Sequence, residues 1–101
     1  KNFGGPANDA GHSLVVNNNG HFIVTGYTES YGQGNADILF YEIDDTGNQL
    51  DLRTFGGEGS EMGNKIIRTG DEGYVICGSS YFSENSMLTL LKIREKGELD
   101  L

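Results

Sequence analysis

The residues that could act as acids, bases or metal ligands are scattered along the chain. His12 and His21 stand apart from each other and from the single cysteine, Cys77, so the chain offers no set of zinc ligands. Segment 44–48, DDTGN, lacks the alternating oxygen ligands and the distal glutamate of a calcium loop. It predicts instead a turn capped by Asp44, and we expect neither a metal nor a cofactor.

Covalent catalysis has no candidate residues, because the chain contains neither a Ser/His/Asp order nor a G-x-S-x-G elbow. Its 15 acidic residues make chance carboxylate pairs common, and no pair stands out as the acid and base of a glycosidase. Cys77 lies in the apolar run YVICGSS and is expected to be a small buried hydrophobe. The sequence favours a non-enzymatic protein and leaves a fragment of a hydrolase or lyase as an alternative.

The balance of charge excludes several classes of partner. The chain has 101 residues, with 7 basic and 15 acidic side chains and a formal net charge of −8. Phosphate contacts need clustered Lys and Arg, so we expect no nucleic-acid partner. No apolar stretch approaches the roughly 18 residues of a membrane span, so we expect no membrane insertion. The chain opens on KNFGG without an initiator Met, and we expect a processed product or a fragment.

An internal repeat organises the elements that must position any site. Shifting the chain by 52 residues brings glycines and apolar residues into coincidence. The matches are 3–5 with 55–57, Gly11 with Gly63, Gly26 with Gly78, and 22–24 with 74–76. After short deletions, 37–47 meets 87–97 and LDL at 50–52 meets LDL at 99–101. The pattern predicts two copies of one unit, 1–52 and 53–101.

Each copy reads as four short strands. The expected strands are 12–17, 21–27, 37–44 and 50–55, then 64–69, 73–79, 87–94 and 99–101. Asn19-Gly20 between the first two strands is a strong hairpin signal. The second and third strands are apolar on both faces, which requires cover on both sides. The sequence therefore predicts an all-β chain of two four-stranded antiparallel sheets.

The phrase TFGG, the run GYVICGSS and the segment DILFYEIDDTGN together resemble the β-propeller repeats of bacterial secreted and surface proteins. The resemblance covers essentially the whole chain. It implies two propeller blades that close a ring by oligomerisation or belong to a longer propeller, with self-association through the blade faces. It also implies an extracellular or cell-surface location. Met87 replaces Asp37 and Glu61 replaces Asp9, so any role of those aspartates is expected in one blade alone.

The FGG phrase is expected where the chain leaves the outermost strand of one blade and enters the next. Its glycines would serve backbone geometry, and a phosphate-binding role lacks the helix and lysine that it needs. Phe3 and Phe55 are expected to pack as apolar plugs at this crossing.

Long loops at one rim are the expected binding surface. They are 4–12, 27–37, 56–64 and 79–87, and the opposite rim has only tight turns. The candidate ligand-binding residues on them are Tyr27, Tyr31, Asn35, Asp37, Tyr81 and Phe82. We expect a binding or scaffold module with a protein or glycan ligand. A carbohydrate-binding lectin is one alternative, and aromatic side chains that merely seal the blade tops are another.

Overall fold

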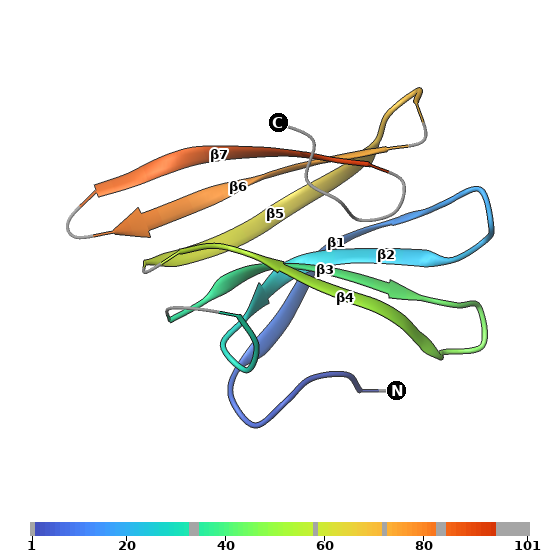
Figure 1. Cartoon of the computed structure of the whole chain (residues 1–101), viewed down its shortest axis with the longest axis horizontal. Helices are drawn as coiled ribbons and strands as arrows, with labels where there is room; N and C mark the ends of the chain where they lie inside the picture. Colours follow the sequence, from blue (N-terminus) through green and yellow to red (C-terminus); the bar gives the residue numbers. More distant parts are fainter. Residues whose placement is uncertain (1, 33–34, 58, 72, 83–84, 95–101) are drawn as a thin grey trace.

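All the regular structure in the described part of the chain is β-structure. The computed structural model describes residues 2–32, 35–57, 59–71, 73–82 and 85–94 (Figure 1). Its strands are β1 (Asp9–Val16), β2 (Phe22–Thr28), β3 (Asp37–Ile43), β4 (Gln49–Phe55), β5 (Ser60–Arg68), β6 (Tyr74–Phe82) and β7 (Asn85–Ile93). No helix occurs in these ranges, so the all-β prediction is confirmed. No helix in the described ranges is long and apolar enough to cross a membrane.

The strands form two antiparallel sheets in which neighbours in the sheet are also neighbours in the chain. The first sheet has the order β1-β2-β3-β4 and the second has the order β5-β6-β7. Strand β4 runs across the predicted boundary between residues 52 and 53, and the first sheet ends at Phe55. The fourth strand predicted for the second copy, 99–101, lies outside the described residues.

The first turn of each sheet closes with the same hydrogen bond. The amide of Asn17 donates to the His21 carbonyl at 2.9 Å, and the amide of Thr69 donates to the Gly73 carbonyl at 2.9 Å. Asn17 Oδ1 also accepts the amides of Asn19 and His21, each at 3.0 Å. A short polar side chain therefore holds the turn, as Asx turns do.

The turn between β3 and β4 is capped by Asp44, as predicted. Asp44 Oδ1 accepts the amides of Asn48 and Thr46 at 2.8 and 3.0 Å, and the Thr46 hydroxyl at 2.8 Å. The Asn48 amide and the Thr46 hydroxyl hold the pKa of Asp44 well below its usual 3.8. The ionised carboxylate therefore serves as the hydrogen-bond acceptor that holds this turn.

The two sheets share an irregularity, which supports the internal repeat. The β1–β2 register shifts between Gly11 and Ser13, and the β5–β6 register shifts between Gly63 and Lys65. A β-bulge thus occurs at the same position of each copy.

Two equivalent glycines sit beside these bulges. An ideal Cβ on Gly26 would lie 1.9 Å from the Ala10 carbonyl oxygen, and one on Gly78 would lie 2.0 Å from that of Met62. Because the obstructing atoms belong to the backbone, neither position has room for a side chain.

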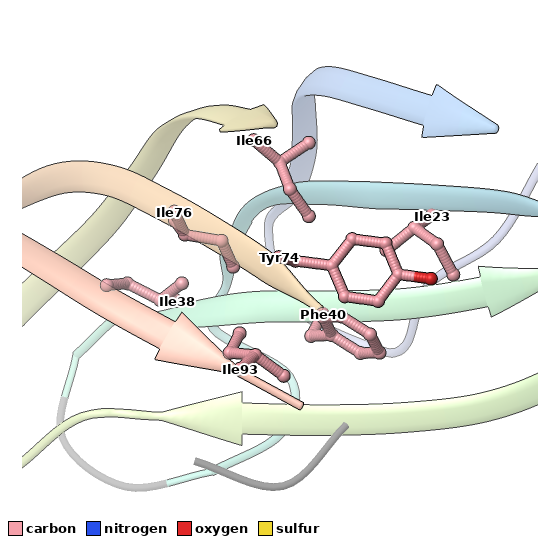
Figure 2. Close-up of a cluster of buried hydrophobic side chains, with 7 residues drawn as sticks. All are labelled: Ile23, Ile38, Phe40, Ile66, Tyr74, Ile76 and Ile93. Atoms are coloured by element: carbon pink, nitrogen blue, oxygen red, sulfur yellow. The ribbon is translucent and has the colours of Figure 1, made fainter. Parts of the chain in front are cut away.

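The main core lies between the two sheets (Figure 2). It is built by Ile23, Ile38, Phe40, Ile66, Tyr74, Ile76 and Ile93. The rings of Phe40 and Tyr74 meet edge to face across the interface, with centroids 5.6 Å apart. Gly63 allows β5 to approach the first sheet, since a Cβ there would lie 2.3 Å from Thr25 Oγ1.

A second cluster covers part of the opposite face of the first sheet. Leu39, Tyr41 and Ile43 form it, with Val24 and Leu52 against them. The segment before β1 runs along this face, on the side away from the second sheet (Figure 1), and Phe3 approaches Tyr41 with ring centroids 5.4 Å apart. The predicted packing of Phe3 is thus seen at Tyr41, while Phe55 packs against the core between the sheets.

Among the described residues, none covers the outward face of the second sheet, where Ile67, Leu88 and Leu90 are exposed. Cys77 lies there, half-buried, in register with Lys65 on β5 and Leu90 on β7. The prediction of a buried Cys77 is therefore wrong, because its apolar run lies in a strand with only one covered face.

Candidate functional site

The crossing between strands is fixed in both copies by a carboxylate four residues downstream. The amide of Gly5 donates to Asp9 Oδ2 at 3.0 Å, and the amide of Gly57 donates to Glu61 Oε1 at 3.3 Å. The prediction that Asp9 would act in one copy alone is therefore wrong, because Glu61 accepts the equivalent bond with its longer side chain.

Asp9 also ties the start of β1 to the end of β2. The Thr28 hydroxyl donates to Asp9 Oδ1, and the Ser30 hydroxyl donates to Oδ2 at 2.8 Å. Burial raises the pKa of Asp9, but the hydrogen bonds from Thr28, Gly5 and Ser30 outweigh it and hold the pKa below 3.8. Asp9 is therefore an ionised structural anchor.

A cavity of about 230 Å³ lies between the first FGG segment and the outer face of the first sheet. It is lined by Asn2, Phe3, Gly4, Asp9, Ala10, Gly11, Val24, Tyr31, Leu39, Tyr41 and Ile43. Tyr31 and Phe3 are exposed beside it, and the Tyr31 hydroxyl donates to the Gly4 carbonyl at 3.2 Å. The cavity thus combines an apolar floor with an aromatic edge and a carboxylate.

A second cavity, of about 400 Å³, lies at the second FGG segment between the sheets. It is lined by Ile38, Thr54, Phe55, Gly56, Gly57, Glu61, Ser80, Thr89 and Leu91. Six of these residues occupy the repeat positions of residues in the first cavity: Thr54 for Asn2, Phe55 for Phe3, Gly56 for Gly4, Glu61 for Asp9, Thr89 for Leu39, and Leu91 for Tyr41. The two cavities are therefore one feature present once in each copy.

The predicted binding residues do not gather around one point. Tyr31 lines the first cavity, and Asn35 is exposed in the connection that follows β2. Tyr27 lies inside β2, opposite Ile38, rather than in a loop; its ring is 6.0 Å from that of His12. The prediction of a loop beginning at residue 27 is wrong, because β2 continues to residue 28.

The loop predicted at 79–87 is also wrong, because β6 and β7 extend through most of it. Tyr81 is exposed in β6, and alternation places it on the face opposite Tyr74 and Ile76. It therefore cannot share a ligand with Tyr31. Phe82 ends β6, and its side chain lies outside the described part of the structure.

Asp37 is buried, with 1% of its surface exposed, and lines none of the cavities described above. A Cβ on Gly56 would lie 2.4 Å from Asp37 Oδ1 and 2.8 Å from Glu61 Oε2, so the two carboxylates face the same glycine. Sequence reasoning did not single out Glu61 as a functional residue, although its alignment with Asp9 was the available signal. Asp37 is enclosed, whereas Glu61 is half-buried and lines the second cavity.

Comparisons of the chain with protein families and with curated proteins found no relative. No family model matches the chain, and no curated protein matches it. Within the described residues, no group of three or more His, Cys, Asp or Glu side chains could hold a metal ion.

Proposed function

We propose that the two sheets are blades of a β-propeller and that the chain is a non-enzymatic binding or scaffold module. The observation that carries this proposal is the repeated cavity at the FGG crossing, present at equivalent positions of both copies. Two stacked antiparallel meanders joined by such a crossing also suit propeller blades. Following the resemblance, we place the module outside a bacterial cell or on its surface.

The ligand side of the proposal rests on the first cavity, at the end of the sheet where β2 ends. Its exposed edge is the ring of Tyr31, and its floor is the apolar side of Leu39 and Tyr41. An aromatic ring beside polar backbone and a carboxylate suits the flat face of a sugar or a peptide side chain. The ligand is accordingly a glycan or a protein segment, and the lectin function remains the second candidate because of the exposed Tyr31 ring.

Labelled protein on glycan and peptide arrays tests this function. We expect Tyr31→Ala to lower the retained signal by at least about fivefold, since stacking on one ring contributes on the order of 1 kcal/mol. Tyr81→Ala is the matched control, because Tyr81 is also an exposed tyrosine but lies on a different face. Its signal should equal that of the unmodified chain.

Melting temperatures of the same variants separate binding from folding. The unmodified chain and Tyr31→Ala should melt together, because the hydroxyl bond from Tyr31 to Gly4 is exposed. A large drop in melting temperature would indicate a sealing role for the ring. No retained ligand on either array, or an equal loss in Tyr81→Ala, would contradict the proposed site.

A further inference from the structure

The buried face of the first sheet and the free face of the second sheet are the same face of the repeat. The half-buried Val15 and the buried Ile23, Ile38 and Phe40 correspond to Ile67, Val75, Leu88 and Leu90. Ile38 and Phe40 are each 1% exposed, whereas Leu88 and Leu90 are 81% and 62% exposed. The second sheet therefore presents to solvent the apolar surface that the first sheet buries.

The other two faces are also equivalent to each other. The inward-facing side chains Ile66, Tyr74, Ile76, Leu91 and Ile93 correspond to Leu14, Phe22, Val24, Tyr41 and Ile43 on the outer face of the first sheet. This outer face is free around Leu14 and Phe22, whereas Tyr41 and Ile43 are buried in the cluster that Phe3 approaches. Ile66 is 1% exposed and its equivalent Leu14 is 57% exposed. Each free face is thus built like one half of the interface that already exists inside the chain.

We propose that the free face of the second sheet docks on the free face of the first sheet of a second copy of this chain. The contact would repeat the packing of the first sheet on the second within one chain (Figure 2). Neighbouring exposed apolar side chains such as Leu88 and Leu90 mark an interaction site. Because the two faces differ, the interface is heterologous and extends head to tail, closing a ring where the rotation allows it. This inference rests on the proposed blade arrangement and not on the ligand.

Two details of shape fit a second copy as the occupant. Gly63 makes room for Thr25 inside the chain, and its equivalent Gly11 lines an open hollow on the free face. That hollow would receive Cys77 of the partner subunit, the repeat equivalent of Thr25. A pairing of identical faces would instead oppose Leu90 to its own copy, a contact with no counterpart in the chain.

Docking would also complete the first cavity. Ile38, from the neighbouring sheet, forms one wall of the second cavity, and the first cavity has no such wall. Leu88 of the partner subunit, the equivalent of Ile38, would supply it. The partner copy thus contributes a residue to the proposed ligand site.

Analytical ultracentrifugation of two complementary variants tests this interface. Leu90→Asp blocks the free face of the second sheet, and Leu14→Asp blocks that of the first; both side chains are exposed, so the fold should be kept. We expect the unmodified chain to form assemblies larger than a dimer and each variant alone to be a monomer. An equimolar mixture of the variants should double the mass to a dimer and go no further.

Met87→Asp is the matched control, since Met87 is exposed next to Leu88 but on the opposite side of β7. This variant should assemble like the unmodified chain. In the unmodified chain, the rate of Cys77 alkylation should fall severalfold on assembly, because the interface would cover Cys77. A monomeric unmodified chain, or association of either blocked variant with itself, would overturn the proposal. Array binding by the monomeric variants, compared with and without Tyr31→Ala, tests the ligand function independently of assembly.

Discussion

Carboxylates at the turns act as hydrogen-bond acceptors that shape the backbone. Asp44 and Asp71 lie in different turns, and the pKa of each is held well below 3.8. For Asp71 the causes are the Lys92 ammonium at 2.8 Å, then the Thr69 hydroxyl and the Gly73 amide. A lowered pKa means that the folded state favours the ionised form, so these groups stabilise the fold above the usual pKa and lose that effect in acid.

We predict that Asp44→Asn destabilises the chain near neutral pH and that the difference shrinks as the pH falls below 3.8. Asparagine keeps an oxygen acceptor but has no charge to strengthen the bonds from Asn48 and Thr46. Urea unfolding at a series of pH values measures the difference, with the exposed neighbour Asp45→Asn as control. A difference that stays constant down to strongly acid pH would show that the charge of Asp44 has no part in the turn.

At the scale of the strands, glycines decide how closely the sheets approach. Gly63 and Gly11 hold the same repeat position, but only Gly63 faces another sheet. We predict that Gly63→Ala lowers the free energy of unfolding by about 1–3 kcal/mol, because a Cβ would meet Thr25 Oγ1 and the methyl groups of Ile38 and Ile76.

Gly11→Ala is the matched comparison, since its Cβ would meet only Val24 Cγ1, at 3.1 Å. In the monomer it should cost less than about 1 kcal/mol. Denaturant midpoints of the two variants, measured in the Leu90→Asp background to exclude association, make the comparison. Equal losses would contradict the account of sheet packing.

The sequence predicted the strands well and the loops poorly, for physical reasons. Strands appear as β-branched and aromatic runs between turn residues, and Asp44 and the glycines marked the turns correctly. The extent of β6 and β7 was missed because polar residues such as Ser80 and Thr89 pair across the strands, with their hydroxyl oxygens 2.6 Å apart. The half-exposure of Cys77 could not be predicted, since an apolar run does not show which of its faces is covered.

The candidate site was foreseen only in part. The repeated FGG phrase indicated the crossing, and Tyr31 was named correctly as a residue beside it. The cavities themselves depend on the approach of Phe3 to Tyr41 and of Phe55 to Leu91, which are long-range contacts that no local pattern specifies.

At the scale of the whole molecule, equivalent faces of the two sheets point the same way along the stack (Figure 1). One end of the stack therefore presents one face of the repeat, and the other end presents the opposite face, so the stack is directional. The direction explains why equivalent residues such as Phe40 and Leu90 differ so widely in exposure.

Nuclear Overhauser contacts of the Phe40 ring in solution test this directed stacking most directly. The account predicts cross-peaks from Phe40 to the Tyr74 ring, whose centroid lies 5.6 Å away, and none to the methyl groups of Leu88 or Leu90. Cross-peaks from Phe40 to those leucines would show that the second sheet packs through its other face, and would contradict both the repeat geometry and the proposed head-to-tail interface.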